Sequence, residues 1–237
     1  MVIPCIDMKI ILIGAGNLAT QLAVALQKKG MTPAYIYSRT RESAEQLSER
    51  LRDVPYSTDI SRVPTDGDLY IFAVKDSALL DLVSRMPSNR GLWVHTAGSL
   101  DMEVFAPYTA RYGVFYPMQT FSKERETDFD DIPIFVETNH TDDTERLQKL
   151  AGRLSTKVYE ATSEQRKYLH LAAVFACNFS NHLYALCDRI LSEHGLPFET
   201  MLPLIRETAA KVADMPPAQA QTGPAIRYDK NVIDKQM

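Results

Sequence analysis

Short apolar runs alternate with helical patterns through the first two thirds of the chain. The runs have strand length, and in the segments between them apolar residues recur every three or four positions. This alternation predicts an α/β domain with a doubly wound, mostly parallel sheet, in which the carboxyl ends of the strands share one edge. We expect strands at Lys9–Ile13, Ala34–Tyr37, Leu69–Val74, Leu92–His95, Gly113–Tyr116 and Ile134–Glu137. We expect helices at Leu18–Lys28, Arg41–Leu51, Ser77–Arg85 and Asp142–Leu154.

The pattern changes near residues 157–160. One apolar helical pattern then runs from Ser163 to Glu193, and a second helix follows from Phe198 to about Ala213. We therefore predict a dinucleotide-binding domain over residues 1–160 and an all-helical domain over residues 161–237. A helical domain of this size is too small to bury every side of so apolar a helix. This predicts packing against the first domain and against a second copy of the chain, as a homodimer.

Composition excludes several classes of protein. A hydrophobic content of 45% and a charged content of 24% over 237 residues are typical of a soluble globular protein. The net charge of −4 gives no basic face for nucleic acid, and no apolar stretch approaches the ~18 residues of a membrane span. The cysteines Cys5, Cys177 and Cys187 are scattered and lack metal-ligand spacing. With no signal peptide in Met1–Asp7, we expect a cytoplasmic protein without a metal site.

A glycine-rich turn follows the first predicted strand. The segment Gly14-Ala15-Gly16-Asn17-Leu18-Ala19 comes directly after an apolar run and opens a helical pattern. This context is typical of a dinucleotide-binding turn, in which the first glycine permits the tight bend and the second lets the backbone approach a pyrophosphate. We expect Gly14, Gly16, Asn17 and Leu18 to contact the pyrophosphate at the helix N-terminus.

The end of the second predicted strand indicates which dinucleotide binds. An NAD site places an acid about 20 residues after the glycines, but this chain has Ser38-Arg39-Thr40-Arg41 there, with no acid before Glu42. Guanidinium groups and hydroxyls suit a 2′-phosphate, so Ser38, Arg39 and Thr40 predict NADP(H). The alternative is that Arg39 and Arg41 are solvated loop residues.

Two further strand ends carry candidate cofactor contacts. Val74 and Lys75 follow the Leu69–Val74 run, and their backbone is expected to line the path of the dinucleotide. Asp76 or Ser77 is as well explained as a helix N-cap.

The segment His95-Thr96-Ala97-Gly98-Ser99 follows the next strand. Its small residues would let the backbone at Thr96 and Ala97 approach a nicotinamide ring. His95 titrates in a useful range for catalysis, but a structural, hydrogen-bonded histidine is the interpretation that we favour.

Polar residues interrupt two other apolar patterns. Gln119, in Pro117-Met118-Gln119-Thr120-Phe121, is placed to bind a carboxamide or a substrate carbonyl, or to satisfy its own loop. In the long helix, His170, Asn178 and Asn181 fall within roughly 80° of arc at 100° per residue. Buried amides and imidazoles need polar partners. These partners are substrate and nicotinamide, or an interdomain hydrogen-bond network.

Four segments together resemble a known group: His95–Ser99, Pro117–Phe121, the helix from His170 to Asn178, and Thr222–Arg227. The first domain resembles the NADP-binding domain of F420-dependent NADP reductases, pyrroline-5-carboxylate reductases and β-hydroxyacid dehydrogenases. Nearly the whole chain resembles Rossmann-like proteins with a C-terminal domain of unknown function, DUF2520. The resemblance implies a Rossmann-type fold, NADP(H) binding and dimerisation, and it names no substrate.

The chain departs from this group in two places. The catalytic lysine of the β-hydroxyacid dehydrogenases is missing, since no lysine lies between Lys167 and Lys211. His170 is the candidate proton donor in its place. Members of the resembling group continue into a further helix where this chain stops at Met237, and the sequence leaves open whether it is truncated there.

These observations support two hypotheses of different class. The first is an NADP(H)-dependent oxidoreductase that transfers hydride between nicotinamide and a small carbonyl or imine, in a cleft between the domains. His170 or His95 would be the acid or base, and Asn178 and Gln119 would orient the substrate. The second is a non-catalytic NADP(H)-binding module that senses redox state. The sequence leaves open the substrate, the direction of the reaction and any role for F420.

Overall fold

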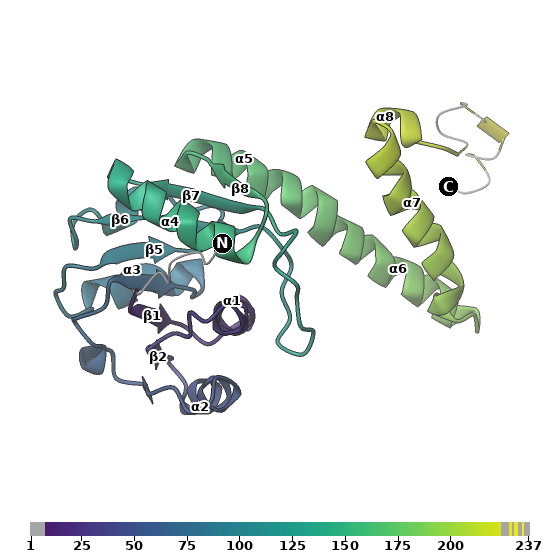
Figure 1. Ribbon diagram of the computed structural model, residues 1–237. Coiled ribbons are helices and arrows are strands. Elements are labelled where there is room, and N and C mark those ends of the chain that lie inside the picture. The colour runs from purple at the N-terminus through teal and green to yellow at the C-terminus, as the bar shows by residue number, and fades with distance from the viewer. Residues whose placement is uncertain (1–7, 224–227, 229, 232–233, 235–237) are drawn as a thin grey trace. The chain divides into compact units, whose positions relative to one another are not determined.

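The computed structural model describes residues 8–223, 228, 230, 231 and 234. Its packing divides the chain into two units, Met1–Cys177 and Asn178–Met237. The first unit holds a sheet covered by helices, and the second is helical (Figure 1). Among the described residues, no helix combines the length and the hydropathy needed to cross a membrane.

The first unit is built on one eight-stranded sheet with the order β3-β2-β1-β4-β5-β6-β7-β8. All neighbouring strands are parallel except β6 and β7, which pair antiparallel with Phe115 opposite Val136. The first six strands follow the order of the doubly wound dinucleotide-binding fold, which confirms the predicted fold class. The strands are β1 (Ile10–Ile13), β2 (Tyr35–Tyr37), β3 (Tyr56–Ser57), β4 (Leu69–Phe72), β5 (Leu92–His95), β6 (Tyr112–Pro117), β7 (Ile134–Thr138) and β8 (Val158–Glu160).

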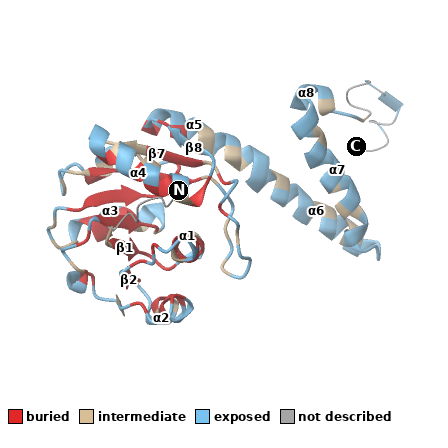
Figure 2. Cartoon of the chain, viewed as in Figure 1, coloured by how far each residue is buried: buried red, intermediate tan, exposed pale blue. Residues whose placement is uncertain are grey.

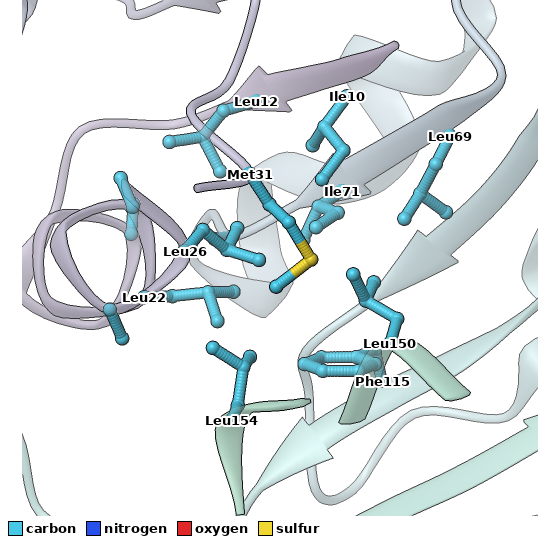
Figure 3. Packing of buried hydrophobic residues seen from close by; sticks show 14 of the residues in the cluster. Ile10, Leu12, Leu22, Leu26, Met31, Leu69, Ile71, Phe115, Leu150 and Leu154 are labelled. Atoms are coloured by element: carbon cyan, nitrogen blue, oxygen red, sulfur yellow. The ribbon is translucent and has the colours of Figure 1, made fainter. Parts of the chain in front are cut away.

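Helices cover both faces of this sheet because its strands are apolar on both sides. One face packs against α1 (Asn17–Lys28), α2 (Arg41–Arg50) and α4 (Thr141–Leu154), and the other against α3 (Asp76–Ser84) with the short helices η1 (Ile60–Arg62) and η2 (Met102–Phe105). In β1, Ile10 and Leu12 enter the first core and Ile11 and Ile13 the second. Figure 3 shows the first core, where side chains of β1 and β4 meet those of α1 and α4.

The C-terminal part is helical, as predicted. The segments are α5 (Ser163–Ala173), η3 (Val174–Phe179), α6 (Ser180–Glu193), η4 (Phe198–Met201), α7 (Leu202–Asp214) and α8 (Pro217–Ala220). Segment η3 is a π-helical turn, so the predicted helix from Ser163 to Glu193 does not keep one regular α-helical spacing. The packing division falls after Cys177, within η3, so α5 belongs to the first unit. The domain boundary after residue 160 stays a prediction.

The helices of the second unit carry exposed apolar side chains. None of its described residues is buried (Figure 2). Large apolar side chains lie exposed along its helices, among them Phe179, Leu183, Ile190, Leu204 and Val212. We call this set the apolar surface of the second unit.

A buried arginine joins α5 to the sheet. Arg166 is fully buried, and its Nη1 donates to Oε2 of Glu137 at 2.7 Å. The remaining guanidinium nitrogens donate to the carbonyl oxygens of Ala97 and Leu100 and to Ser163 Oγ. Ser163 in turn donates from its backbone nitrogen and its hydroxyl to Glu137. The first turn of α5 is therefore fixed against the loop after β5 and the end of β7.

We expect Glu137→Ala to destabilise the first unit by about 3–5 kcal/mol, because it leaves the buried Arg166 charge without its partner. The measurement is urea unfolding followed by the fluorescence of Trp93, the single tryptophan, which is buried beneath α3. Glu145→Ala is the matched control, since Glu145 forms an exposed ion pair with Lys149 and its loss should cost less than about 0.5 kcal/mol. Equal effects of the two variants would contradict the assigned role of Arg166.

Candidate functional site

A cavity of about 620 Å³ lies at the carboxyl ends of β1, β2 and β4. Between β1 and β4 the strand order reverses direction, and ligands of this fold class bind at that point. The volume lies within the ~300–1,000 Å³ typical of ligand pockets. Its lining includes seven predicted cofactor residues: Gly14, Gly16, Ser38, Arg39, Thr40, Val74 and Lys75.

The two glycines of the turn have different roles. Gly14 has φ +126°, and a Cβ added there would lie 2.2 Å from the Ala73 carbonyl oxygen. Its N–H donates to the Tyr37 carbonyl at 2.7 Å, so Gly14 joins three strand ends. A Cβ added at Gly16 would meet nothing within 4 Å, so the space in front of this residue is open.

Gly16 is also the N-cap of α1, and no side chain caps this helix end. The first-turn N–H groups have no partner within the helix, and no acidic residue lies in that turn. The open space, the unpaired donors and the helix dipole together fit a pyrophosphate.

Asn17 and Leu18 do not line the cavity. Asn17 donates from Nδ2 to the Phe121 carbonyl at 3.1 Å, and Leu18 packs against the core. Any cofactor contact of these two residues is thus left to their backbone. Gln21, which the sequence reading missed, is 1% exposed and binds the carbonyl of Ser122 and the N–H of Thr127. The sequence signal for Gln21 was a glutamine on the apolar face of the predicted helix.

The structure separates the two arginines that follow β2. Arg39 is exposed and lines the cavity, whereas Arg41 lies outside its lining and faces Glu45 at 3.8 Å. Ser38 is buried, and its Oγ accepts from the Thr40 N–H at 3.4 Å. Thr40 is the N-cap of α2 without a side-chain cap bond. Arg41 is therefore a helix residue outside the cavity rather than a loop residue, and the cofactor role of Arg39 stays a prediction.

The N-cap expected at Asp76 or Ser77 is wrong, because Lys75 is the N-cap of α3. Asp76 instead occupies the first turn of α3, where its carboxylate is favourable to the helix dipole. Its Oδ2 accepts from the Ser99 hydroxyl at 2.8 Å. This bond fixes the loop after β5 against the start of α3.

His95 is held as a structural residue. It is 1% exposed, its Nδ1 accepts from the Ala97 N–H at 3.2 Å, and its Nε2 lies 3.3 Å from the Asp101 carbonyl. With Nδ1 as acceptor, Nε2 carries the proton and donates. Burial, assisted by the nearby Arg166 charge, lowers the pKa of His95 to about 4. Both nitrogens are engaged and the ring is neutral, which argues against the catalytic role considered for it.

Thr96 and Ala97 lie where the fourth and fifth strands of the sheet end. Thr96 is buried, and its N–H donates to the Phe72 carbonyl at 3.2 Å. The Ala97 carbonyl accepts from Nε of Arg166 at 3.2 Å. The backbone here is fixed in place, and a cofactor contact of either residue stays a prediction.

His170 meets this same loop. A Cβ added at Gly98 would lie 2.5 Å from His170 Nδ1, so the imidazole packs directly on the glycine. The Tyr116 hydroxyl, at the end of β6, lies 3.2 Å from His170 Nδ1. Burial raises the pKa of Tyr116, so the phenol stays protonated near neutral pH. Within the part of the chain that the structure describes, His170 Nε2 has no hydrogen-bond partner, which leaves it available to a substrate.

The structure does not hold Gln119 and Asn178 in a polar network. Gln119 is exposed, and its Oε1 accepts from the backbone N–H of Thr120 at 2.8 Å. Asn178 is exposed in η3, and the π turn alters the angle per residue on which the predicted polar stripe depends. The expectation of a buried Asn178 is wrong within one chain. The segment Thr222–Arg227 lies mostly outside the described residues.

Comparison with known proteins agrees with this geometry. Residues 3–118 match the model of a Rossmann-like domain, and residues 132–237 match that of DUF2520, a domain of unknown function. The crystal structure of the proposed NADP oxidoreductase BF3122 from Bacteroides fragilis is 52% identical, covers 97% of this chain and 90% of its own, and has a TM-score of 0.90. No curated protein gave a significant match.

More distant structures share the fold. Protein TM1727 from Thermotoga maritima is 24% identical, with a TM-score of 0.80 over 96% of this chain and 88% of its own. A reductive aminase from Aspergillus terreus, solved with NADPH and ethyl levulinate, is 16% identical, with a TM-score of 0.70 over 87% of this chain and 74% of its own.

Fold and cavity thus define a Rossmann-like dinucleotide-binding protein. The chain belongs to the family of Rossmann-like proteins with a C-terminal DUF2520 domain, together with the Bacteroides fragilis protein. This confirms the family expected from the sequence.

We expect the neutral burial of His95 to make the protein less stable as the pH falls. Its pKa is about 4 when folded and about 6.5 when unfolded, so the unfolded state alone takes up a proton between these values. The free energy of unfolding is therefore highest above pH 6.5. It falls by about 2 kcal/mol between pH 7 and pH 5. Urea unfolding at both pH values should show this loss in the wild type and a smaller one in His95→Gln. The same pH dependence in both proteins would contradict the buried, neutral state assigned to His95.

Proposed function

We propose that the protein is an NADP(H)-dependent oxidoreductase that transfers hydride between the nicotinamide and a small carbonyl or imine substrate. The observation that carries the proposal is the cavity in which the Gly14–Gly16 turn and Arg39 lie on one sheet edge. The 52% identity to a proposed NADP oxidoreductase supports the same class. The substrate class is supported by the fold likeness to a reductive aminase and to the pyrroline-5-carboxylate reductase of Coxiella burnetii, and by the position of His170.

The residues present fit NADP(H). The α1 N-terminus behind Gly16 would hold the pyrophosphate, and Arg39 with Thr40 would hold the 2′-phosphate. The backbone at Val74 and Lys75 would line the path between them. When bound, the nicotinamide supplies or accepts the hydride.

The protein's own part in the chemistry is to manage one proton. With the Tyr116 hydroxyl donating to His170 Nδ1, the other nitrogen carries the hydrogen and donates to the oxygen or nitrogen of the substrate. Gly98 packs against the same ring. His170 is therefore proposed as the general acid or base, and Tyr116 as the residue that fixes its tautomer. The orienting roles of Gln119 and Asn178 stay predictions.

We expect the wild type to bind NADPH more tightly than NADH, and Arg39→Ala to lose most of this preference, by about tenfold or more in NADPH affinity. Isothermal titration calorimetry with both dinucleotides measures this directly. Tight binding of neither dinucleotide by the wild type would refute the oxidoreductase proposal.

Gly16→Ala provides an independent check of the pyrophosphate site. The added methyl group meets no protein atom within 4 Å, so the fold is retained while the approach of a phosphate is blocked. Gly152→Ala in α4 is the matched control, because its added methyl group also meets nothing within 4 Å and it lies outside the cavity lining. We expect NADPH binding to fall in the first variant only.

His170→Ala separates an enzyme from a redox sensor, the rival supported by the absence of a lysine between Lys167 and Lys211. For an enzyme, NADPH oxidation with a panel of carbonyl compounds and cyclic imines should fall by ~10²–10⁴-fold, with the NADPH dissociation constant unchanged. Wild-type protein that binds NADPH but turns over no compound of the panel would favour the sensor.

We further propose a homodimer formed through the apolar surface of the second unit. The support is that none of the described residues of this unit is buried in a single chain. The cytoplasmic location expected from the sequence also stays a prediction.

We expect light scattering to give the mass of a dimer for the wild type and of a monomer for Leu183→Glu. Leu183 is 62% exposed on α6, and a charge there would not fit an apolar contact between copies. Leu80→Glu, at an exposed leucine of α3, is the control and should stay dimeric. A monomeric wild type would refute the proposal.

A further inference from the structure

A second arginine reaches the cavity from a different element. Arg85 is the C-cap residue of α3, and it lines the same cavity as Arg39. The two residues arrive from opposite faces of the sheet, since α2 follows Arg39 on one face and α3 precedes Arg85 on the other. A ligand in this cavity would therefore meet guanidinium groups from two sides.

Tyr37 lines the same cavity and interacts electrostatically with both arginines. Its side chain is 4% exposed at the end of β2, and it also lines the cavity. Burial raises the pKa of Tyr37, while the charges of Arg85 and Arg39 act in the opposite direction. Both guanidinium groups are thus within electrostatic range of one hydroxyl on the cavity wall.

The present partner of Arg85 holds it only weakly. Its Nη1 lies 3.3 Å from Oδ2 of Asp81, one turn earlier in α3, with side-chain exposures of 58% and 72%. Exposed pairs of this kind contribute little to stability. A phosphate dianion, which accepts two parallel N–H bonds from a guanidinium, competes well with a single exposed carboxylate.

The charge of the cavity lining suits a polyanion. Among the residues that the structure describes, the cationic members of the lining are Arg39, Lys75, Arg85 and Lys123, and the only acidic member is Asp81. The phosphates of a pyrophosphate are already served by the backbone donors at the N-terminus of α1, so they do not use all of these positive charges. The remaining positive charge, with Arg39 and Arg85 both in the lining, fits a further phosphate.

We propose that Arg85 is a second specificity-determining residue, which leaves Asp81 and binds the 2′-phosphate of the dinucleotide opposite Arg39. This inference rests on the proposed NADP(H) function. It assigns discrimination between the phosphorylated and unphosphorylated cofactor to α3 as well as to the loop after β2.

The test compares four ligands by calorimetry: NADPH, NADH, adenosine 2′,5′-bisphosphate and AMP. For Arg85→Ala we expect affinity for the two 2′-phosphorylated ligands to fall by about tenfold, with affinity for NADH and AMP within about twofold of the wild type. Arg62→Ala is the matched control, because Arg62 also forms an exposed ion pair within its own helical turn, with Asp59, but does not line the cavity. It should bind all four ligands like the wild type.

Asp81→Asn supplies a second variant with the opposite expectation. It removes the competing carboxylate and a repulsive charge, so NADPH should bind more tightly and NADH unchanged. An equal loss for all four ligands in Arg85→Ala would show a general adenosine contact and overturn the inference, as would no loss at all. Failure of the wild type to bind NADPH would instead refute the proposed function, and the inference with it.

Discussion

The position of the candidate catalytic histidine depends on one buried charge. Arg166 has no exposed surface, and its guanidinium bonds to Glu137 and to the carbonyls of Ala97 and Leu100. His170 comes one helical turn later on the same side of α5, because residues four apart lie one above the other. The network therefore sets both the direction of the helix and the loop on which the imidazole rests. A buried ion pair of this kind is weak evidence for added stability, but it specifies one arrangement of the parts it joins.

The two ends of the proposed cofactor path are built differently. At the pyrophosphate end the groups belong to the backbone, and Gly14 and Gly16 matter because they lack a side chain. At the adenosine end the groups are exposed side chains, Arg39 and Arg85, on helix and loop termini. Backbone donors favour any diphosphate, while flexible cations select among dinucleotides. Affinity and selectivity are thereby assigned to separate parts of one cavity.

The sequence was enough to predict the sheet and the glycine turn, because both leave local signals. Apolar runs such as Ile10–Ile13 and the spacing of the glycines are readable within one segment. Strand β3 has only 2 residues, and β8 is a half-buried to exposed Val-Tyr-Glu segment, so neither forms an apolar run in the sequence. The role of His95 was not readable, since its partners are backbone atoms of Ala97 and Asp101 placed by the fold. The π turn at η3 likewise gives no sequence signal, and it altered the spacing assumed for Asn178.

The difference between the backbone contacts and the side-chain contacts of the cavity also explains which residues can change without loss of the fold. Gly14 is enclosed by the Ala73 carbonyl at a φ that side chains rarely adopt, so the turn and the packing of β1 on β4 depend on each other. Arg39, Arg85 and Asp81 are exposed and make at most one weak ion pair. Their replacement changes the charge of the cavity with little effect on folding, because exposed pairs contribute little. Replacement of these exposed residues can therefore change the cofactor preference while the fold stays the same. A replacement of Gly14 would disturb the sheet as well as the phosphate-binding turn.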